Sequence, residues 1–309
     1  FRCNIFEPKK FSKGWDNYNI GLDIGERYLR VSLDKLKILS KWRPQKNFKS
    51  VLIIGEQGLG DELMFSLLLK KLNLSETKIG LLFDKRLKNL FASSDLSHEF
   101  IESFDEALEK KYESYISIGS LCKYFIKSES DFSKLPNLNI RTNKKLISDL
   151  KSKLVHKFTI GISWHTSNKQ LGSLRNIKLK QFLPLFLELN ANFINLQYGD
   201  HISEIAKVSR KIKKDVFIKD NIDNKADLDS FAAKVSVCDL ILSIDNSTVH
   251  LAGILNKNTI AFIPEVSDWR WFGKNDKCLW YQNTTLIRKS KSWDPAIKDA
   301  ILYCKNLIN

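Results

Sequence analysis

Short apolar runs alternate with helix-like segments along most of this chain, and this alternation limits the fold more than any other feature of the sequence. Residues 50–55 (SVLIIG) form an apolar run typical of a buried strand, whereas the apolar residues within 61–73 recur at helical spacing. Further strands are predicted at 78–84, 114–121, 158–164, 192–198, 215–220, 239–245 and 259–264. Such alternation predicts parallel sheets with helices on both faces.

The length of the chain predicts two domains. One hydrophobic core rarely serves more than about 250–300 residues, and this chain has 309. The polar stretch 128–145 separates two runs of the alternating pattern, so we predict two doubly wound α/β domains with a boundary near residue 140. Ligands of such sheets bind outside the carboxyl ends of the strands, and a cleft between the domains is the expected site.

Net charge and cysteine content exclude several classes of protein. The formal charge is +15 at pH 7, but the basic residues are spread along the chain in short groups such as Lys70 and Lys71. Because no long basic patch with interleaved aromatics is present, we expect no specific nucleic-acid partner. The charge favours anionic small molecules or an anionic membrane surface. Five cysteines without a C-x-x-C pair predict reduced thiols in the cytoplasm.

A glycine-rich turn, GEQGLGDE, follows the first predicted strand. Its glycines, Gly55, Gly58 and Gly60, are spaced G-x-x-G-x-G without a following Lys-Ser/Thr, which excludes a P-loop. Asp84 lies about 20 residues beyond the turn, where a dinucleotide fold keeps its ribose-binding acid. Against an NAD site, Asp61 stands at the predicted helix start, where it would repel a pyrophosphate. Whether Asp61 takes part in chemistry or only caps its helix stays open at this point.

A second strand-to-helix turn, Asp-Asn-Ser-Thr at 245–248, is better suited to an anion. Hydroxyls and free N–H groups at the start of a helix can bind a diphosphate, and the helix dipole adds favourable electrostatics. Two small residues, Ala252 and Gly253, would let this helix pack closely on the sheet. Capping of the helix by Asp245 or Ser247 is the structural alternative.

Polar loops follow two neighbouring strands of the same predicted sheet. The loop after 158–164 carries Lys169 and Arg175, which could neutralise the phosphates of a leaving group, and Glu204 after 192–198 could accept ribose hydroxyls. Solvated basic side chains and an exposed helix face are the alternatives. Because the carboxyl ends of parallel strands meet at one edge, we expect these loops to meet the turn at 245–248.

Six blocks of the sequence, in order, resemble the glycosyltransferase family 9-like proteins, relatives of the heptosyltransferases of lipopolysaccharide synthesis that are often found at the end of tetratricopeptide-repeat chains. The blocks, within roughly residues 50–293, are GEQGLGDELMF, YISIGSL, GISW with RNIKL, FINLQYGD, CDLILSIDNSTVHLAG, and DWRWFGK with WYQNTTLIRKS. The segment FSKGWDNYNIGL resembles the one that joins repeats to the catalytic part. With Phe1 in place of an initiator Met, we expect that repeats were removed or lost.

The resemblance implies a GT-B fold, in which two Rossmann-like doubly wound domains face each other across a cleft. Residues 1–45 would be an N-terminal helical or linker segment, and 46–140 the acceptor domain. Residues 141–309 would be the nucleotide-sugar donor domain, with a final helix that crosses back to the first domain.

The resemblance also implies roles for individual residues. The proposed general base of the relatives maps onto Asp61, and their donor-gripping Asp-Thr-Gly block maps onto Asp245, Asn246 and Ser247. His250 matches their histidine, although an ordinary packed histidine is the alternative. The predicted donor-binding residues are Lys169, Arg175, Glu204, Asp245, Asn246, Ser247, Thr248 and His250, and Gly58, Gly60, Trp269 and Arg270 are expected to line the cleft.

The activity that the resemblance implies is an inverting, metal-independent glycosyl transfer from a nucleotide sugar to an acceptor hydroxyl of a glycan, lipid-linked molecule or protein. No cofactor or metal is expected, since the D-x-D at 227–229 fits the polar start of a helix. The expected location is the cytoplasm, with peripheral association at the inner face of the membrane. The alternatives are a GT-B nucleotide-sugar epimerase or hydrolase, an NAD-dependent enzyme, and a non-catalytic nucleotide-sugar-binding module.

Overall fold

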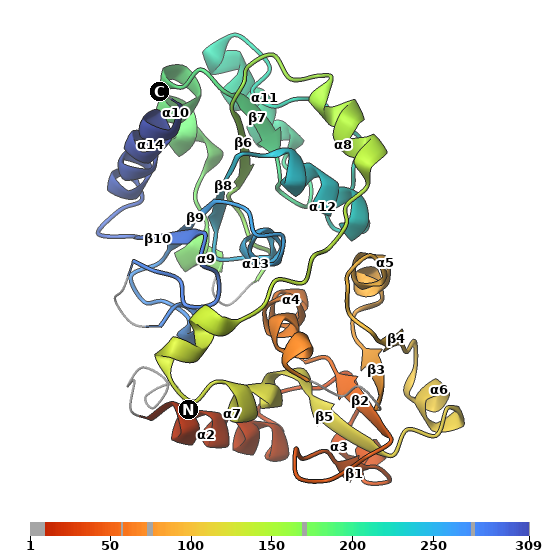
Figure 1. Cartoon of the computed structure of the whole chain (residues 1–309). Coiled ribbons are helices and arrows are strands. Elements are labelled where there is room, and N and C mark those ends of the chain that lie inside the picture. Colours follow the sequence, from red (N-terminus) through yellow and green to blue (C-terminus); the bar gives the residue numbers. More distant parts are fainter. Residues whose placement is uncertain (1–9, 57, 73–76, 169–171, 273–275, 309) are drawn as a thin grey trace. The chain divides into compact units, whose positions relative to one another are not determined.

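The computed structural model describes residues 10–56, 58–72, 77–168, 172–272 and 276–308. The chain divides after residue 140 into two compact units, here called unit 1 (Phe1–Ile140) and unit 2 (Arg141–Asn309) (Figure 1). A five-stranded sheet, parallel throughout, lies at the centre of each unit. The prediction of two α/β domains with parallel sheets is confirmed.

Unit 1 has the strand order β1-β5-β2-β3-β4. Its elements are α2 (Phe11–Asp23), α3 (Leu33–Leu36), β1 (Ser40–Lys41), β2 (Ser50–Ile54), α4 (Leu59–Phe65), η2 (Ser66–Lys71), β3 (Lys78–Leu82), η3 (Lys85–Leu87), α5 (Lys88–Ala92), β4 (Glu99–Phe100), α6 (Phe104–Glu109), β5 (Ser114–Ser117), η4 (Ile118–Leu121), α7 (Cys122–Phe125) and η5 (Glu129–Lys134). The next strand after β2 lies on one side of it and β5 lies on the other. The strand order therefore switches between β2 and β5, the point at which open α/β sheets bind ligands.

The described residues that precede β2 are part of the fold of unit 1. Helix α2 buries one face, including Trp15 and Tyr18. Strand β1 pairs in parallel with β5, and beyond it the backbone N–H of Trp42 donates to the carbonyl of Tyr115 at 2.8 Å. This part of the segment predicted to be helical or linker thus supplies both a helix and an edge strand.

Unit 2 has the strand order β10-β9-β8-β6-β7, which switches between β6 and β8. Its elements are α8 (Lys144–Lys151), β6 (Thr159–Ser163), α9 (Gly172–Arg175), η6 (Leu179–Phe182), α10 (Leu183–Glu188), β7 (Asn192–Asn195), α11 (Ile202–Ile212), α12 (Leu228–Val237), β8 (Leu240–Ile244), α13 (Ser247–Ile254), β9 (Thr259–Ile263), η7 (Trp269–Trp271), β10 (Thr284–Arg288) and α14 (Asp294–Ile308). Strands β6, β8 and β9 are buried along their whole length, as their continuous apolar runs predict.

Two elements of unit 2 differ from the sequence prediction. Residues 215–220 are not a strand: Val216 and Phe217 are buried, but the segment only donates one backbone hydrogen bond, from Ile218 to Phe193 at 2.9 Å. At the opposite edge of the sheet, β10, which was not predicted, pairs with β9. Helix α14 packs into the core of unit 2 through Ile297 and its neighbours, and the expected crossing to the first domain stays a prediction.

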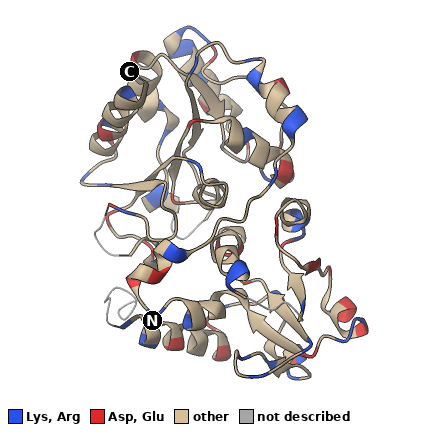
Figure 2. Ribbon diagram, viewed as in Figure 1, with Lys and Arg blue, Asp and Glu red and all other residues tan. Residues whose placement is uncertain are grey.

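Charge and hydropathy are distributed as in the sequence prediction. In the view of Figure 2, Lys and Arg are spread over helices and loops of both units. Among the helices that the structure describes, none is long and apolar enough to cross a bilayer. Cys122, Cys238, Cys278 and Cys304 are buried free thiols.

Candidate functional site

The strand order of unit 2 switches between β6 and β8, and the residues after β8 link the two strands. Asn246 is the N-cap of α13: its side-chain oxygen accepts from the backbone N–H of Thr248 at 2.9 Å. Its amide nitrogen donates to the hydroxyl oxygen of Ser163, the last residue of β6, at 2.8 Å. The cap is therefore Asn246 and not Asp245 or Ser247, and its amide both accepts from the helix and donates to the neighbouring strand.

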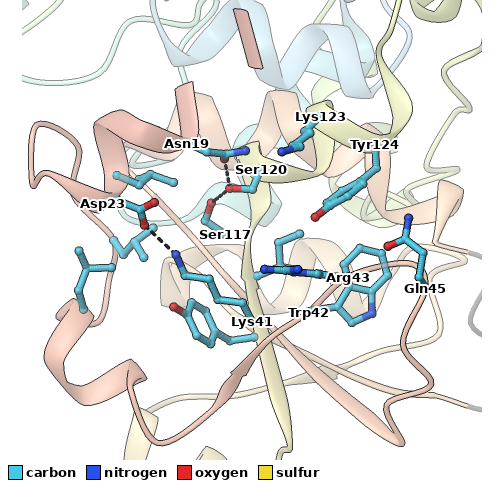
Figure 3. A pocket seen from close by; sticks show the side chains of 15 residues that line it. Asn19, Asp23, Lys41, Trp42, Arg43, Gln45, Ser117, Ser120, Lys123 and Tyr124 are labelled. Carbon is cyan, nitrogen blue, oxygen red and sulfur yellow. Dashed lines mark hydrogen bonds and ion pairs between the residues drawn. The ribbon is translucent and has the colours of Figure 1, made fainter. Parts of the chain in front are cut away.

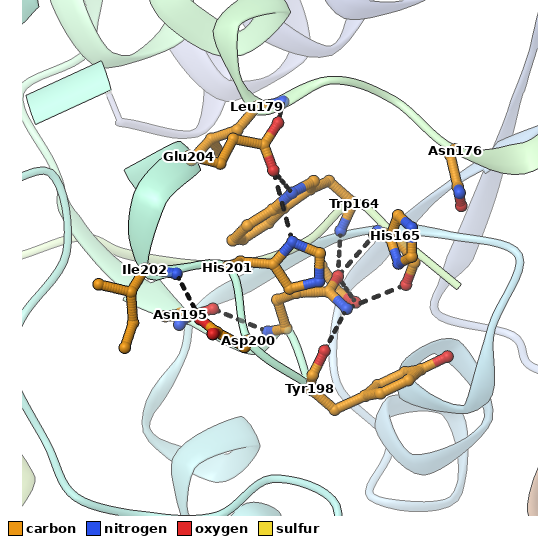
Figure 4. A network of polar contacts seen from close by, with 12 residues as sticks. Trp164, His165, Asn176, Leu179, Asn195, Tyr198, Asp200, His201, Ile202 and Glu204 are labelled. Atoms are coloured by element: carbon orange, nitrogen blue, oxygen red, sulfur yellow. Dashed lines mark hydrogen bonds and ion pairs between the residues drawn. The ribbon is translucent and has the colours of Figure 1, made fainter. Parts of the chain in front are cut away.

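Gln197, which the sequence prediction missed, organises the loop after β6. Its side-chain oxygen accepts from the backbone N–H groups of Trp164 and His165 at 2.9 and 2.8 Å. Its amide nitrogen donates to the carbonyls of His165 and Tyr198 at 3.0 and 2.8 Å (Figure 4). The only hint in the sequence was a polar residue near the end of the apolar run NFINLQY. Gln197 fixes the loop that flanks the start of α13.

The predicted anion-binding residues at the start of α13 differ in exposure. Thr248 and His250 are buried, and the Thr248 hydroxyl lies 3.4 Å from that of Ser163. Ser247, the first residue of the helix, is partly exposed. The helix dipole and the first N–H groups favour an anion at this end. The residue that offers a hydroxyl to a ligand there is therefore Ser247.

Four charged side chains form a cluster beside α13, in which Asp245 is buried and the other three are partly exposed. Arg175 Nε lies 3.1 Å from Asp245 Oδ2, and the Arg175 guanidinium lies 3.5 Å from Asp268. Arg270 pairs with Asp268 as well. Burial raises the pKa of Asp245 to about 6, against the opposing effect of Arg175. For Asp268, burial favours the neutral form, but Arg270 and Arg175 hold its pKa below the usual value. The two predicted anion-binding arginines are thus already balanced by carboxylates.

His250 is packed inside unit 2. Its Nδ1 lies 2.9 Å from the Tyr281 hydroxyl, and its ring stacks on Trp271 with centroids 5.5 Å apart. Burial and the nearby Arg270 lower its pKa to about 3, so the imidazole is neutral at pH 7.

Gly253 has a different role from the predicted one. A Cβ there would collide with the ring of Tyr281, so the glycine makes room for that ring rather than for the sheet.

The remaining predicted residues of unit 2 have varied surroundings. Glu204 accepts from Trp164 Nε1 at 2.9 Å and from the backbone N–H of Leu179 at 2.7 Å, so each of its oxygens already holds one donor (Figure 4). Its ribose-binding role stays a prediction. Trp269 is buried, with the Arg270 guanidinium 4.7 Å from its ring centroid. Lys169 lies outside the described residues.

In unit 1, Asp61 lies in the first turn of α4. The N-cap is Gly58, Gly60 is the second residue of the helix, and Asp61 is the third. The backbone N–H of Asp61 donates to the carbonyl of Gly58 at 3.0 Å. Its side chain is mostly shielded, since the residue is 7% exposed. Asp61 is therefore not the capping residue of α4, and the chemical role stays a prediction.

Two further acids, Glu56 and Glu62, lie at the same turn, and neither was predicted to be a site residue from the sequence. Glu62 is buried, pairs with Arg30 and accepts from the backbone N–H of Asp84 at 2.9 Å. Burial raises its pKa to about 6, against the opposing effect of Arg30. Gly55 leaves the space that this carboxylate fills, because a Cβ there would collide with it. The first glycine of the turn thus accommodates an acid of the protein itself.

Glu56 spans the point where the strand order of unit 1 switches. Its Oε1 accepts from the backbone N–H of Gly119, just beyond β5, at 2.6 Å, and its Oε2 pairs with Arg27 at 2.7 Å. Burial raises its pKa to about 7, against the effect of Arg27. Asp84, the residue expected of an NAD site, accepts from Arg86 N at 3.1 Å, and the Arg86 side chain lowers its pKa to about 2. The turn is therefore acidic, and its buried glutamates are held by hydrogen bonds and ion pairs within unit 1.

The described residues hold no group of three or more His, Cys, Asp or Glu that could bind a metal ion. Within the D-x-D, Asp227 is the N-cap of α12 and accepts from the backbone N–H of Ser230 at 3.0 Å. This carboxylate is therefore used at the start of a helix.

The two units, each with a parallel sheet, define a two-domain α/β protein. No family model matches the chain. Protein FlbA of Caulobacter vibrioides is 25% identical over 281 residues, which are 81% of this chain and 45% of FlbA. The chain thus spans about half the length of that curated relative.

Three solved structures share the fold. The glycosyl transferase family 9 protein from Veillonella parvula has a TM-score of 0.55 at 10% identity and covers 86% of this chain and 93% of its own. The ADP-heptose lps heptosyltransferase II of E. coli has a TM-score of 0.57 at 11% identity, with 84% and 99% covered. E. coli heptosyltransferase WaaC with ADP has a TM-score of 0.51 at 11% identity, with 84% and 99% covered. The chain therefore has the GT-B fold.

Proposed function

We propose that this chain is a glycosyltransferase that moves a sugar from a nucleotide-sugar donor to an acceptor hydroxyl. The observation that carries the proposal is the start of α13, where Asn246 caps the helix and Ser247 is exposed at the switch in strand order of unit 2. Open α/β sheets bind nucleotides at this place, and a helix start favours their phosphates. The names of the structures that share the fold, one of them with ADP, support the same class.

In the proposed reaction, the donor diphosphate binds at the start of α13. The N–H groups of the first turn and the Ser247 hydroxyl donate to it, and the helix dipole stabilises the charge that gathers on the leaving group. Arg175 and Arg270 keep Asp245 and Asp268 in place beneath the helix start. Because this four-residue cluster is balanced, the positive potential at the site comes mainly from the helix.

Asp61 is the general base of the proposal. As the acceptor oxygen forms its bond to the anomeric carbon, the bond from that carbon to the diphosphate oxygen breaks, and the acceptor proton passes to Asp61. Such transfers pass through an oxocarbenium-like transition state. One displacement inverts the anomeric centre, and no metal is invoked because the leaving charge is met by the helix start. The mechanism requires Asp61 to reach the acceptor hydroxyl while the donor is bound.

The acceptor class and the cellular setting stay predictions. A glycan, a lipid-linked molecule and a protein all offer the required hydroxyl. Attachment to tetratricopeptide repeats, a cytoplasmic location and peripheral association with the inner face of a membrane are expectations from the sequence. The anomeric configuration of the product, measured by NMR, distinguishes inversion from retention.

A thermal-shift panel of ADP-, UDP-, GDP-, CMP- and dTDP-sugars, with magnesium and with chelator, tests the donor site. We expect one nucleotide class to raise the melting temperature, and the shift to survive chelation. The variant Ser247→Ala should reduce the shift, whereas Ser148→Ala, on the exposed face of α8, should leave it unchanged. Indifference to every nucleotide sugar, or a shift that Ser247→Ala leaves intact, would contradict the proposal.

A further inference from the structure

Unit 1 contains a pocket that the proposed reaction does not use. It has a volume of about 520 Å³, within the range of small-molecule sites, and is lined by residues of α2, β1, β5 and the segments that follow these strands (Figure 3). Its lining includes none of the residues 55–62 that form the acidic turn. Part of it comes from residues 19–45, which precede the region that resembles known glycosyltransferases. The pocket is thus a separate feature of this chain.

Positive charge dominates the lining of the pocket. Lys41, Arg43 and Lys123 contribute cations, and Asp23 is the one acid among the lining residues. Lys41 donates to Asp23 at 2.8 Å, and Lys123 pairs at 2.7 Å with Asp16, outside the pocket. Arg43 forms no ion pair with any residue that the structure describes. One cationic side chain of the pocket therefore has no counter-charge among the residues that the structure describes.

Arg43 lies close enough to Lys41 for the two charges to oppose each other. The hydrogen bond to Asp23 raises the pKa of Lys41, whereas the neighbouring Arg43 acts in the opposite direction. An anion between the two cations would relieve this repulsion. Figure 3 shows the Lys41 amine joined to Asp23, with Arg43 and Lys123 among the side chains that surround the same pocket.

The other groups of the pocket suit a polyhydroxylated ring. Ser120 donates to the side-chain oxygen of Asn19 at 2.6 Å, and its own oxygen lies 2.6 Å from the Ser117 hydroxyl. This hydrogen-bonded row lies on one side of the pocket, and Tyr124 lies on another, edge-on to Trp42 with ring centroids 5.5 Å apart (Figure 3). Aromatic rings pack against apolar ligand faces while hydroxyl and amide groups bond to polar edges.

We propose that this pocket binds a sugar that carries a carboxylate or a phosphate. Arg43 and Lys41 bind the anionic group, the Ser117, Ser120 and Asn19 row bonds to ring hydroxyls, and Tyr124 packs against a face of the ring. Binding at the pocket needs neither the donor nor Asp61, so this proposal stands or falls independently of the transferase proposal.

Ligand-observed NMR and calorimetry with the whole chain test the proposal. The panel contains glucuronate and N-acetylneuraminate as carboxylated sugars, glucose 6-phosphate as a phosphorylated sugar, glucose as the neutral partner, and citrate as an anion without a sugar ring. We expect one acidic sugar type to bind at least about tenfold more tightly than glucose, because a charge-assisted contact is added. Comparison of the carboxylated and phosphorylated members identifies the anionic group. An excess of nucleoside diphosphate should not displace the sugar.

Three variants locate the binding. Arg43→Gln should weaken the acidic sugar at least about fivefold, whereas Arg141→Gln, also at an exposed arginine, should leave it unchanged. Tyr124→Leu should weaken the sugar but not citrate. Equal affinity for glucose and the acidic sugars, binding of citrate as tight as that of every sugar, or a wild-type affinity in Arg43→Gln would each overturn the proposal.

Discussion

In each unit one side chain bridges the two strands between which the strand order switches, and the two side chains differ in their chemistry. In unit 1 a carboxylate, Glu56, spans from the residues after β2 to Gly119 beyond β5. In unit 2 an amide, Asn246, spans from the residues after β8 to Ser163 at the end of β6. A carboxylate only accepts hydrogen bonds and adds negative charge, whereas an amide also donates and adds none. From this comparison we predict that the turn of unit 1 repels an anion and that the turn of unit 2 binds one.

The surroundings of the two turns reinforce this difference. The first turn of α4 contains Asp61 and Glu62, which occupy the end of the helix that favours anions. The first turn of α13 contains no acid, and its nearest acid, Asp245, is paired with Arg175. Two glycines of unit 1 make room for acids of the protein, Gly55 for Glu62 and Gly119 for Glu56. A glycine-rich turn is therefore no sufficient sign of a phosphate site.

Asp61→Asn should have the largest effect of the changes that test the comparison. If Asp61 is the base, release of nucleoside diphosphate in the presence of acceptor should fall by about 10²–10⁴-fold, since the acceptor proton loses its recipient. Donor affinity, measured by calorimetry, should stay within about twofold because the donor binds at α13. Glu26→Gln, on the surface of unit 1, is the control. Full turnover in Asp61→Asn would leave an epimerase, a hydrolase or a binding module as the better assignment.

The buried acid of unit 1 should make stability fall as the pH rises. Burial raises the pKa of Glu56 from 4.5 to about 7, so the folded state prefers its protonated form. That stabilisation is complete below about pH 4.5 and is lost as the pH rises through about 7. Since one pKa unit corresponds to about 1.4 kcal/mol, wild type should lose up to about 3 kcal/mol relative to Glu56→Gln over this range.

Urea unfolding of both proteins at pH 4.5, 6 and 7.5 measures this difference. In unit 2, the pKa of Asp245 is raised from 3.8 to about 6, so the stabilisation that comes from its protonated form is lost over a lower pH range. A constant difference between wild type and Glu56→Gln across the series would show that the pKa of Glu56 is the same in the folded and unfolded states, which contradicts the prediction.

Asn246→Asp should give unit 2 a carboxylate at the switch in strand order, as unit 1 has with Glu56. The aspartate can still accept from Thr248, so the helix keeps its cap, but it cannot donate to Ser163 and it adds charge where the diphosphate binds. Donor affinity should fall by at least about tenfold. Asn246→Ala removes the cap without adding charge and should lower the free energy of unfolding by about 1–2 kcal/mol.

Calorimetry and urea unfolding of the two variants separate these effects. An Asn246→Asp protein that binds donor as well as wild type does would remove the electrostatic basis of the comparison.

Gly253→Ala in α13 and Gly58→Ala at the N-cap of α4 should differ in their effect on stability. A Cβ at Gly253 would collide with the Tyr281 ring, so the variant should be less stable by about 1–3 kcal/mol. A Cβ at Gly58 meets no atom within 4 Å, and the change there should cost less than about 1 kcal/mol. Thermal unfolding compares them. Equal stability of the two variants would show that the helix adjusts to the ring of Tyr281.

Much of the fold could be predicted from the sequence because buried parallel strands leave long apolar runs. Strands β2, β3, β5, β6, β7, β8 and β9 lie within their predicted ranges. The prediction of a strand at 215–220 was wrong. Val216 and Phe217 are buried and give the segment the apolar pattern of a strand, but the segment does not pair as a strand in the sheet. Strand β10 was missed because Thr284–Arg288 contains only two apolar residues, side by side, without the alternation or the long apolar run that marks a strand.

The site was harder to predict because its geometry depends on residues distant in sequence. The apolar run before Asp245 locates the start of α13, but nothing local shows that Asn246 caps it while holding Ser163. Likewise, the sequence shows Arg175 as a cation and cannot show that Asp245 and Asp268 balance it. The charge of a single residue can be read from a sequence, but the partner that balances it cannot. Pairing across some 80 or 90 positions cannot be read from it either.

Amide hydrogen exchange, with and without the nucleoside diphosphate that the thermal-shift panel selects, tests the central claim most directly. The account predicts slower exchange in residues 244–250, at the start of α13, and no change in residues 55–62, at the acidic turn. Slower exchange at 55–62 without any change at 244–250 would contradict it.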